Sequence, residues 1–302
     1  MAVRHFEVAM TFIQKFWALL LTVLLAGSVS TVAQAQSCAR PVERGFRIFE
    51  GTWYVGKPNL SHLGIEPIHI IDRGLWPDGA GRTGPPDLGK VRTYVESLPR
   101  DNAPIVLDIE DYELTGSDAT ALTALTNLRG LAAAFRTVAP DRRIGFYGIM
   151  PVTDGVRSLA RPGSPPYRAW QQQSDRMSSL LRNVDFLFPP TYTINRDQAA
   201  WTTFATAQIC EARRLSSKPV YVFLWPEFHD GSPLSGQYLE ADFWRLQLET
   251  AYRHADGVVI WGGYDVRANR QRNWNPQAPW YAPTLAFIRE RLGGRATGNR
   301  NP

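Results

Sequence analysis

The chain has 302 residues, of which 44% are hydrophobic and 20% are charged, and it carries a formal net charge of +5. This length suits one large α/β domain. Lys and Arg are spread along the chain instead of forming a basic tract, which argues against nucleic-acid binding and only weakly for an anionic ligand.

The first 35 residues have the pattern of a secretory signal peptide. Arg4 and Lys15 precede an apolar run over Trp17–Leu25, and Ala33–Ala35 offers small residues for cleavage. A retained membrane anchor is the alternative, but glycine and hydroxyl residues interrupt the run before it reaches the roughly 20 apolar residues of a span. We therefore expect a secreted or periplasmic protein that has no membrane contact after cleavage of residues 1–35.

Cys38 and Cys210 are the only cysteines. An exported chain with an even number of cysteines permits one disulfide. The cysteines and histidines have no spacing typical of a metal site. We expect a monomer without a metal or other cofactor.

From about residue 45 onward, short β-type runs alternate with helical patterns, which indicates parallel strands joined by crossover helices. Seven strands in one domain favour a distorted TIM-like (β/α) barrel of seven or eight strands. An open doubly wound sheet is the alternative, although no glycine-rich phosphate loop follows the first strand. The expected strands are Phe46–Tyr54, Ile68–Asp72, Ile105–Asp108, Ile144–Tyr147, Phe186–Phe188, Val220–Trp225 and Val258–Trp261.

Four segments have helical apolar spacing, with Ser117 as a possible cap of the first: Ala119–Val138, Asp197–Leu215, Leu239–His254 and Pro283–Leu292. Two Gly- and Pro-rich loops, Trp76–Asp87 and Arg161–Pro166, are longer than plain connectors need to be. We expect a single barrel domain over residues 36–292, followed by a disordered tail over residues 293–302.

The run Ile105–Tyr112 is the most informative segment for function. Its apolar β-pattern ends in Asp108 and Glu110, and side chains two residues apart in a strand share a face. Active sites of (β/α) barrels lie at the carboxyl ends of the strands. Two neighbouring carboxyl groups repel each other when ionised, so we expect one raised pKa and acid/base chemistry. A solvated turn or a helix cap is the alternative interpretation.

Aromatic residues follow several of the other expected strands. A cleft with carboxylates at its base and aromatic walls suits a sugar, whose C–H faces pack on rings while its hydroxyls bind polar groups. The alternative is that these rings simply fill the mouth of the barrel. The candidate substrate-binding rings are Trp76, Tyr147, Tyr192, Trp225 and Trp261.

Six segments together resemble the hyaluronidases of glycoside hydrolase family 56, in the same order along the chain. The resemblance implies a distorted barrel of about seven strands and a secreted enzyme that cleaves a β-linked N-acetylhexosamine bond with retention. The matching segments are Pro67–Pro77, Thr83–Asp87, Val106–Tyr112, Gly145–Gly148, Phe188–Tyr192 and Gly257–Gly262.

The resemblance also implies roles for individual residues. Glu110 matches the general acid, and Asp108 matches the carboxylate that steadies the acetamido group of the substrate. The family needs no protein nucleophile, because the acetamide oxygen of the sugar attacks C1. Tyr192 matches the residue that orients this acetamide. The residues that match those lining the cleaved sugar are Tyr147, Tyr192 and Trp261, with Trp76 at a position that is usually Tyr.

The chain departs from the animal members of this family in three ways. Cysteines are missing after the Tyr147 motif, where the chain has Ile149–Pro151. An Arg is missing beyond the acidic motif, where the chain has Glu113–Thr115. A cysteine-rich C-terminal module is also missing. These departures leave the preference for hyaluronan open.

We therefore expect a hydrolase of a glycosaminoglycan-like polysaccharide, such as the anionic polymers hyaluronan and chondroitin, or of a related microbial polymer. One alternative is a hydrolase of another glycoside, with Glu110 and a second carboxylate from Glu227 or Asp111. Both of these residues are also candidates for substrate binding. The other alternative is a carbohydrate-binding protein without turnover.

Overall fold

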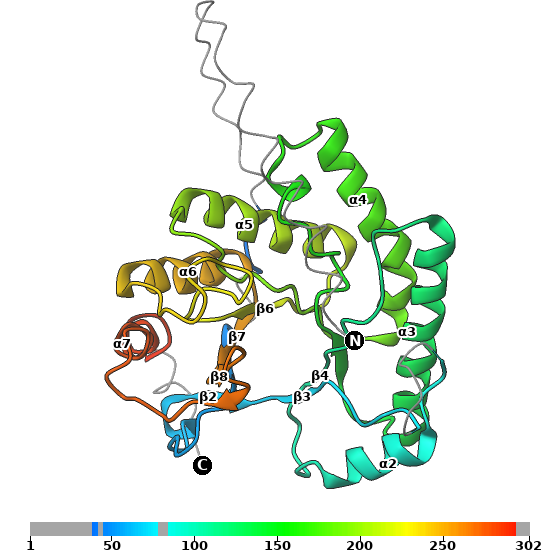
Figure 1. Cartoon of the computed structure of the whole chain (residues 1–302), viewed down its shortest axis with the longest axis horizontal. Helices are drawn as coiled ribbons and strands as arrows, with labels where there is room; N and C mark the ends of the chain where they lie inside the picture. The colour runs from blue at the N-terminus through cyan, green and yellow to red at the C-terminus, as the bar shows by residue number, and fades with distance from the viewer. Residues whose placement is uncertain (1–37, 42–44, 78–83, 294–302) are drawn as a thin grey trace, which may run out of the picture. The chain divides into compact units, whose positions relative to one another are not determined.

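The computed structural model describes residues 38–41, 45–77 and 84–293, which belong to one compact unit (Figure 1). The expected signal peptide and all of the expected tail except Gly293 lie outside these ranges. None of the helices within them is long and apolar enough to cross a membrane.

The strands form two parallel sheets and one hairpin. The first sheet has the order β2-β1-β7-β6 and the second has the order β3-β4-β5. The bounds are β1 Arg47–Thr52, β2 Ile65–Pro67, β3 His69–Ile71, β4 Ile105–Leu107, β5 Ile144–Phe146, β6 Tyr221–Leu224 and β7 Gly257–Gly262, with β8 Tyr264–Asp265 and β9 Arg270–Gln271 in the antiparallel hairpin.

Strand pairing continues around a ring. Only Ile68 separates β2 from β3, and the first of these strands pairs with β1 while the second pairs with β4. The segment 186–190 closes the gap between β5 and β6 through single parallel pairings, among them Tyr147 with Phe188 and Leu187 with Val220. The expected α/β barrel with seven strand positions is confirmed, and the expected strand over residues 186–188 is present as these isolated pairings.

Helices surround the strands (Figure 1). Ser117 caps α3 by accepting from the Thr120 amide, and Asp197 caps α5 in the same way. The four expected helices are present as α3, α5, α6 and α7, whereas α2, α4 and the short 3-10 helices were not expected. The bounds are α2 Leu88–Ser97, α3 Asp118–Val138, α4 Pro165–Met177, α5 Gln198–Leu215, α6 Ala241–His254 and α7 Tyr281–Arg291, with η1 Ser61–Leu63, η2 Arg157–Leu159 and η3 Ser178–Asn183.

The expected loop Arg161–Pro166 needs one correction, because α4 begins inside it. Ser164 is the residue before the helix, and two prolines occupy its first two positions. Proline is tolerated there, since the amides of the first turn have no partner within the helix. The sequence interpretation treated these prolines only as loop residues.

Alternate residues of the strands pack on opposite sides of the barrel wall. A cluster of buried side chains fills the interior, while their neighbours in sequence pack outward with the helices. Gly145 of β5 faces this crowded interior, where a Cβ atom would lie 2.6 Å from the carbonyl oxygen of Phe186. The interior cluster consists of Phe49, Ile68, Val106, Tyr147, Phe186, Phe188, Tyr221, Phe223 and Val259.

A disulfide joins Cys38 to Cys210 of α5, with their Cα atoms 5.3 Å apart. The cysteine count had permitted this bond, and the structure forms it. The Arg40 amide also donates to the Arg253 carbonyl oxygen at 3.0 Å. The chain before β1 is therefore attached to both α5 and α6.

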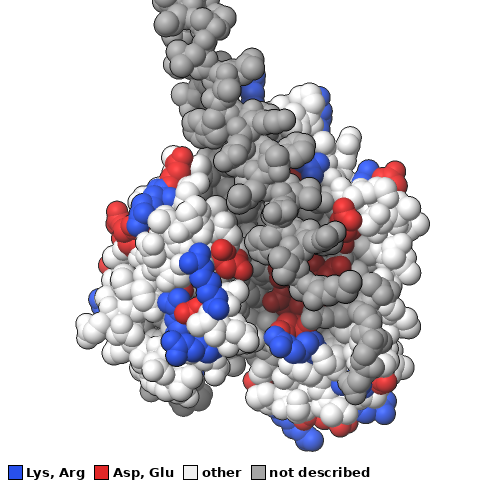
Figure 2. Space-filling model, viewed as in Figure 1, with Lys and Arg blue, Asp and Glu red and all other residues white. Residues whose placement is uncertain are grey.

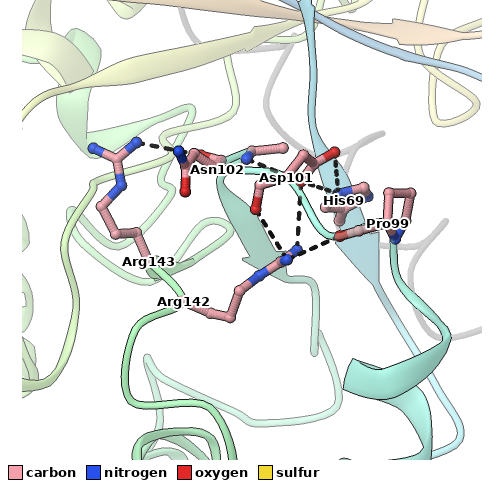
Figure 3. A network of polar contacts seen from close by, with 7 residues as sticks. His69, Pro99, Asp101, Asn102, Arg142 and Arg143 are labelled. Carbon is pink, nitrogen blue, oxygen red and sulfur yellow. Dashed lines mark hydrogen bonds and ion pairs between the residues drawn. The ribbon is translucent and has the colours of Figure 1, made fainter.

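A polar network lies where β3, β4 and β5 begin (Figure 3). The Asp101 carboxylate contacts Nε2 of His69 at 3.0 Å and accepts from the Ala103 amide at 3.1 Å. Arg142 donates to the carbonyl oxygens of Pro99 and Asp101. The network thus joins the segments that precede two strands to the first residue of a third.

Burial alone would raise the pKa of Asp101. The hydrogen bonds from His69 and the Ala103 amide, together with the charges of His69 and Arg142, outweigh burial and hold this pKa below its usual value. A lowered carboxyl pKa means that the ionised form stabilises the fold. This stabilisation is complete above the unfolded-state pKa of about 3.9 and is lost as the pH falls through the lower folded-state value.

Asp101→Asn is expected to lower the free energy of unfolding at pH 7 by about 1–2 kcal/mol, because charge-assisted hydrogen bonds are lost from a partly exposed group. Urea unfolding monitored by circular dichroism at several pH values measures this change. The difference from the wild type should shrink below pH 4. Asp141→Asn, an equal charge change at an exposed position, is the matched control, and an equal loss in both variants would contradict the prediction.

Candidate active site

Strand β4 directs two carboxylates toward the barrel axis. Val106 packs in the interior cluster, whereas Leu107 and Ile109 pack outward with the helices. Asp108 and Glu110 continue the inward alternation beyond the end of the strand. The negative charges of both act on the hydroxyls of Tyr147 and Tyr192 and raise the pKa of each. The two carboxylates therefore lie on the same side of the sheet, near the same hydroxyl pair.

Tyr147 follows β5 and Tyr192 follows the segment 186–190, so neighbouring positions of the barrel bring the two rings together. Their centroids are 6.2 Å apart, and a hydrogen bond joins their hydroxyls. Burial is the largest cause that holds both pKa values well above the usual 10. Both phenols are therefore neutral at physiological pH. One hydroxyl donates to the other, which leaves the second O–H to donate to a ligand.

Two further rings, Trp225 and Trp261, lie beside Tyr192 at the ends of other strands. Trp225 and Trp261 meet edge to face with centroids 4.5 Å apart, and Tyr192 lies 5.5 Å and 6.1 Å from them. Trp225 is buried, whereas Trp261 is partly exposed and presents accessible ring surface. An accessible ring beside buried ones is suited to stacking against the apolar face of a sugar.

The pKa of Glu110 is raised, as expected, but its cause differs from the sequence argument. Partial burial is the largest cause and raises the pKa. The charge of His229 lowers it, and repulsion from Asp230 and Asp111 raises it further. The carboxyl nevertheless reaches the surface, because Glu110 is an exposed residue. A carboxylic acid that keeps its proton to higher pH and remains accessible can donate a proton to a ligand.

His229 is a site residue that the sequence analysis missed. Its ring stacks on Tyr192 with centroids 5.6 Å apart, and its Nδ1 lies 2.8 Å from the Asp230 carboxylate. It also lines the same cavity as Glu110. The available signal was its position in the segment that follows β6 and Trp225, since that end of each strand carries the other site residues.

A cavity of about 720 Å³ contains the core of this site. This volume lies within the range of about 300–1,000 Å³ that is typical of small-molecule sites. Its polar lining residues include Glu110, Glu113, Tyr147, Tyr192, Asn195 and His229.

Only Glu110, Tyr147 and Tyr192 of the nine proposed site residues, all in the described part of the chain, line this cavity. The other six do not: Trp76, Asp108, Asp111, Trp225, Glu227 and Trp261. Trp76 is buried, and its indole nitrogen donates to the Gly84 carbonyl oxygen at 2.9 Å. It therefore packs in the core and fastens the loop that follows β3. Asp111 is exposed and does not line the cavity, but its negative charge helps to raise the pKa of Glu110.

Glu227 and Trp225 line a second cavity of about 430 Å³. Glu227 is fully buried and lies 3.3 Å from Nη1 of Arg272. Burial raises its pKa to about 7, although the charge of Arg272 partly opposes the shift. Glu110 and Glu227 therefore do not face one common cavity, as a pair acting on one glycosidic bond would need to do.

The described residues contain no group of three or more His, Cys, Asp or Glu side chains that could hold a metal ion.

No protein-family model matches the chain, and no curated protein matches it. Among solved structures, bee venom hyaluronidase in complex with a hyaluronic acid tetramer is similar, with a TM-score of 0.56 and 17% identity over 82% of this chain and 96% of that chain. A monoclinic crystal structure of bee venom hyaluronidase gives a TM-score of 0.51 and 18% identity, with coverages of 82% and 97%. A double mutant of Cellulomonas fimi endo-β-1,4-mannanase gives 0.50 and 14%, with coverages of 79% and 58%. These similarities show the (β/α) barrel fold.

Glu227→Gln is expected to change how stability depends on pH. Between the unfolded-state pKa of about 4.3 and the folded value of about 7, the folded protein keeps a proton that the unfolded chain releases, so stability falls as the pH rises. The Gln side chain does not titrate, so the variant does not lose stability in this way as the pH rises. Its free energy of unfolding relative to the wild type should rise by about 2–4 kcal/mol from pH 4.5 to pH 8.

Urea unfolding at both pH values measures this difference. Glu96→Gln, an equal charge change on the exposed surface of α2, is the control. A difference between Glu227→Gln and the wild type that does not change with pH would show that Glu227 is ionised in the folded protein across this range.

Proposed function

We propose that the protein is a glycoside hydrolase that cleaves β-linked N-acetylhexosamine bonds with retention, with Glu110 as general acid and base. One observation carries the proposal. Glu110, with a raised pKa, lies on the same side of the sheet as Asp108, near the paired hydroxyls of Tyr147 and Tyr192. This combination places a proton donor, a second carboxyl group and a neutral phenol that can donate a hydrogen bond near one another.

In the first step, Glu110 gives its proton to the glycosidic oxygen while the acetamide oxygen of the sugar attacks C1 and displaces the leaving group. Positive charge then develops on the acetamide nitrogen, where Asp108 offsets it. Tyr192 orients the acetamide, and Trp261 offers ring surface against the sugar. In the second step, ionised Glu110 takes a proton from water while the water oxygen attacks C1. The bond between C1 and the acetamide oxygen breaks, which regenerates the acetamide and restores the β configuration.

The proposed substrate class is a glycan with β-linked N-acetylhexosamine, for which the sequence resemblance suggests hyaluronan or chondroitin. The N-terminal signal pattern and the disulfide suit an enzyme that acts outside the cytoplasm. The alternative that pairs Glu110 with Glu227 is disfavoured, because these residues line different cavities. A binding protein without turnover would not require a raised pKa at Glu110, and the first experiment below tests it.

Glu110→Gln is expected to lower hydrolysis of an N-acetylhexosamine glycan about 1,000-fold, because the amide cannot donate the proton. Ligand affinity, measured by calorimetry, should change little. In the wild type, kcat/KM should fall as the pH rises through the raised pKa of Glu110, because the acid form is lost.

Glu96→Gln, on α2 and outside both cavities, should keep full activity. A fully active Glu110→Gln variant would overturn the assignment. Tight glycan binding with no cleavage by the wild type would favour the binding protein instead.

Retention is tested by the first product that the wild type releases. Proton NMR during digestion of an N-acetylhexosamine polymer should show the β-anomer before mutarotation mixes the two forms, because two displacements at C1 restore the configuration. First appearance of the α-anomer would rule out acetamide assistance. Glu227→Gln should leave the same β-anomer, whereas a trapped covalent intermediate on Glu227 would favour the two-carboxylate alternative.

A further inference from the structure

One wall of the cavity that holds Glu110 is apolar. It comes from three parts of the chain: the segment after β5, the helix η2, and the residues around the start of α5. These parts follow neighbouring positions of the barrel, so they face the same strand ends as the carboxylates. The apolar residues of this wall include Ile149, Val152, Val156, Leu159, Ile194 and Phe204.

Several of these side chains are open to solvent. Val156 is 81% exposed, Ile194 is 49% exposed and Leu159 is 40% exposed. The described residues include seven exposed large hydrophobic side chains, and three of them gather in this one cavity. Scattered apolar residues on a surface need no explanation, but a group of them in a cavity indicates a binding surface.

The charged residues that line the same cavity would repel a polyanionic ligand. Its described lining residues include Glu110 and Glu113 and contain no Lys or Arg. The side chain there that can become positive, His229, lies against the Asp230 carboxylate. Figure 2 shows Lys and Arg side chains beside Asp and Glu side chains on the face that it presents. A glycan with a carboxylate in each repeat would meet repulsion that no Lys or Arg of the described lining offsets.

The position of Glu110 indicates which part of the substrate meets the apolar wall. A general acid contacts the oxygen of the leaving group, so the departing group lies on the Glu110 side of the cleaved bond. Glu110 and the apolar wall share one cavity of about 720 Å³, which is large enough for a sugar with a chain attached.

We propose that the substrate is an uncharged N-acetylhexosaminide with an alkyl or acyl chain on its leaving-group side, as in a glycolipid, and that the apolar wall binds this chain. The inference rests on the proposed function and keeps its cleavage of an N-acetylhexosaminide, but it replaces the anionic polymers that the sequence resemblance suggests with a neutral, apolar-substituted glycoside.

Binding to the full-length Glu110→Gln protein tests the inference without turnover. The ligands are methyl, butyl and octyl N-acetyl-β-glucosaminide, measured by calorimetry below the concentration at which the octyl compound forms micelles. Each methylene that enters an apolar site tightens binding by about two- to fourfold, so the octyl compound should bind at least 30-fold more tightly than the methyl compound. Equal affinities for the three ligands would overturn the proposal.

Ile194→Asp, combined with Glu110→Gln, places a charge in the wall at an exposed position and should reduce the octyl-to-methyl ratio at least tenfold. Val156→Asp should do the same if Ile194→Asp fails to fold. Leu122→Asp, at a 61% exposed position of α3 outside the cavity, is the matched control and should keep the ratio. An unchanged ratio in the wall variants would overturn the proposal.

Two oligosaccharides of equal length test the charge argument. A neutral β-linked N-acetylglucosamine tetramer should bind at least tenfold more tightly than a hyaluronan tetramer at low ionic strength. Tighter hyaluronan binding that weakens with added salt would overturn the proposal. A chain-length ratio that persists while the wild type cleaves none of these ligands would refute hydrolysis but support the apolar site.

Discussion

The site depends on the alternation of side chains along β4. Because Val106 packs inside the barrel and Leu107 packs outside, the chain directs Asp108 and Glu110 inward as the strand ends. A shift of one residue in the pairing of β4 with β3 and β5 would turn both carboxylates toward the helices. The buried residues on both faces oppose such a shift, so the core that stabilises the barrel also positions the candidate acid.

Burial then raises the pKa values of the acidic groups at this site. Neighbouring rings exclude water from the Tyr147 and Tyr192 hydroxyls and partly from Glu110, and the neutral form of each group is favoured as a result. Glu110 differs from Glu227 in one respect. The first carboxyl remains accessible and the second is fully buried against Arg272. Raised pKa values alone therefore do not separate the candidate acid from a structural carboxyl, whereas access to the cavity does.

The barrel and its carboxylate pair could be predicted from sequence because apolar strand runs and strand ends leave strong local patterns. The helix α2 left a weak pattern, since Val91 is its one buried residue, and α4 begins with prolines that suggested a loop. His229 was missed because its significance comes from stacking on a ring in another segment. Trp76 resembled a cleft residue by position, but its hydrogen bond to Gly84 keeps it in the core. Such contacts between distant segments have no signal in local spacing.

The same reasoning explains why the fold does not fix the substrate. Strand register determines where the carboxylates lie, and this constraint is shared by barrels of very different sequence. The walls come instead from η2 and the segments after β5 and before α5, which lie outside the named strands. A structural similarity at 17% identity therefore concerns the strands, while substrate preference is decided by wall residues. In this chain, those residues are apolar and acidic where a polyanion would require cations.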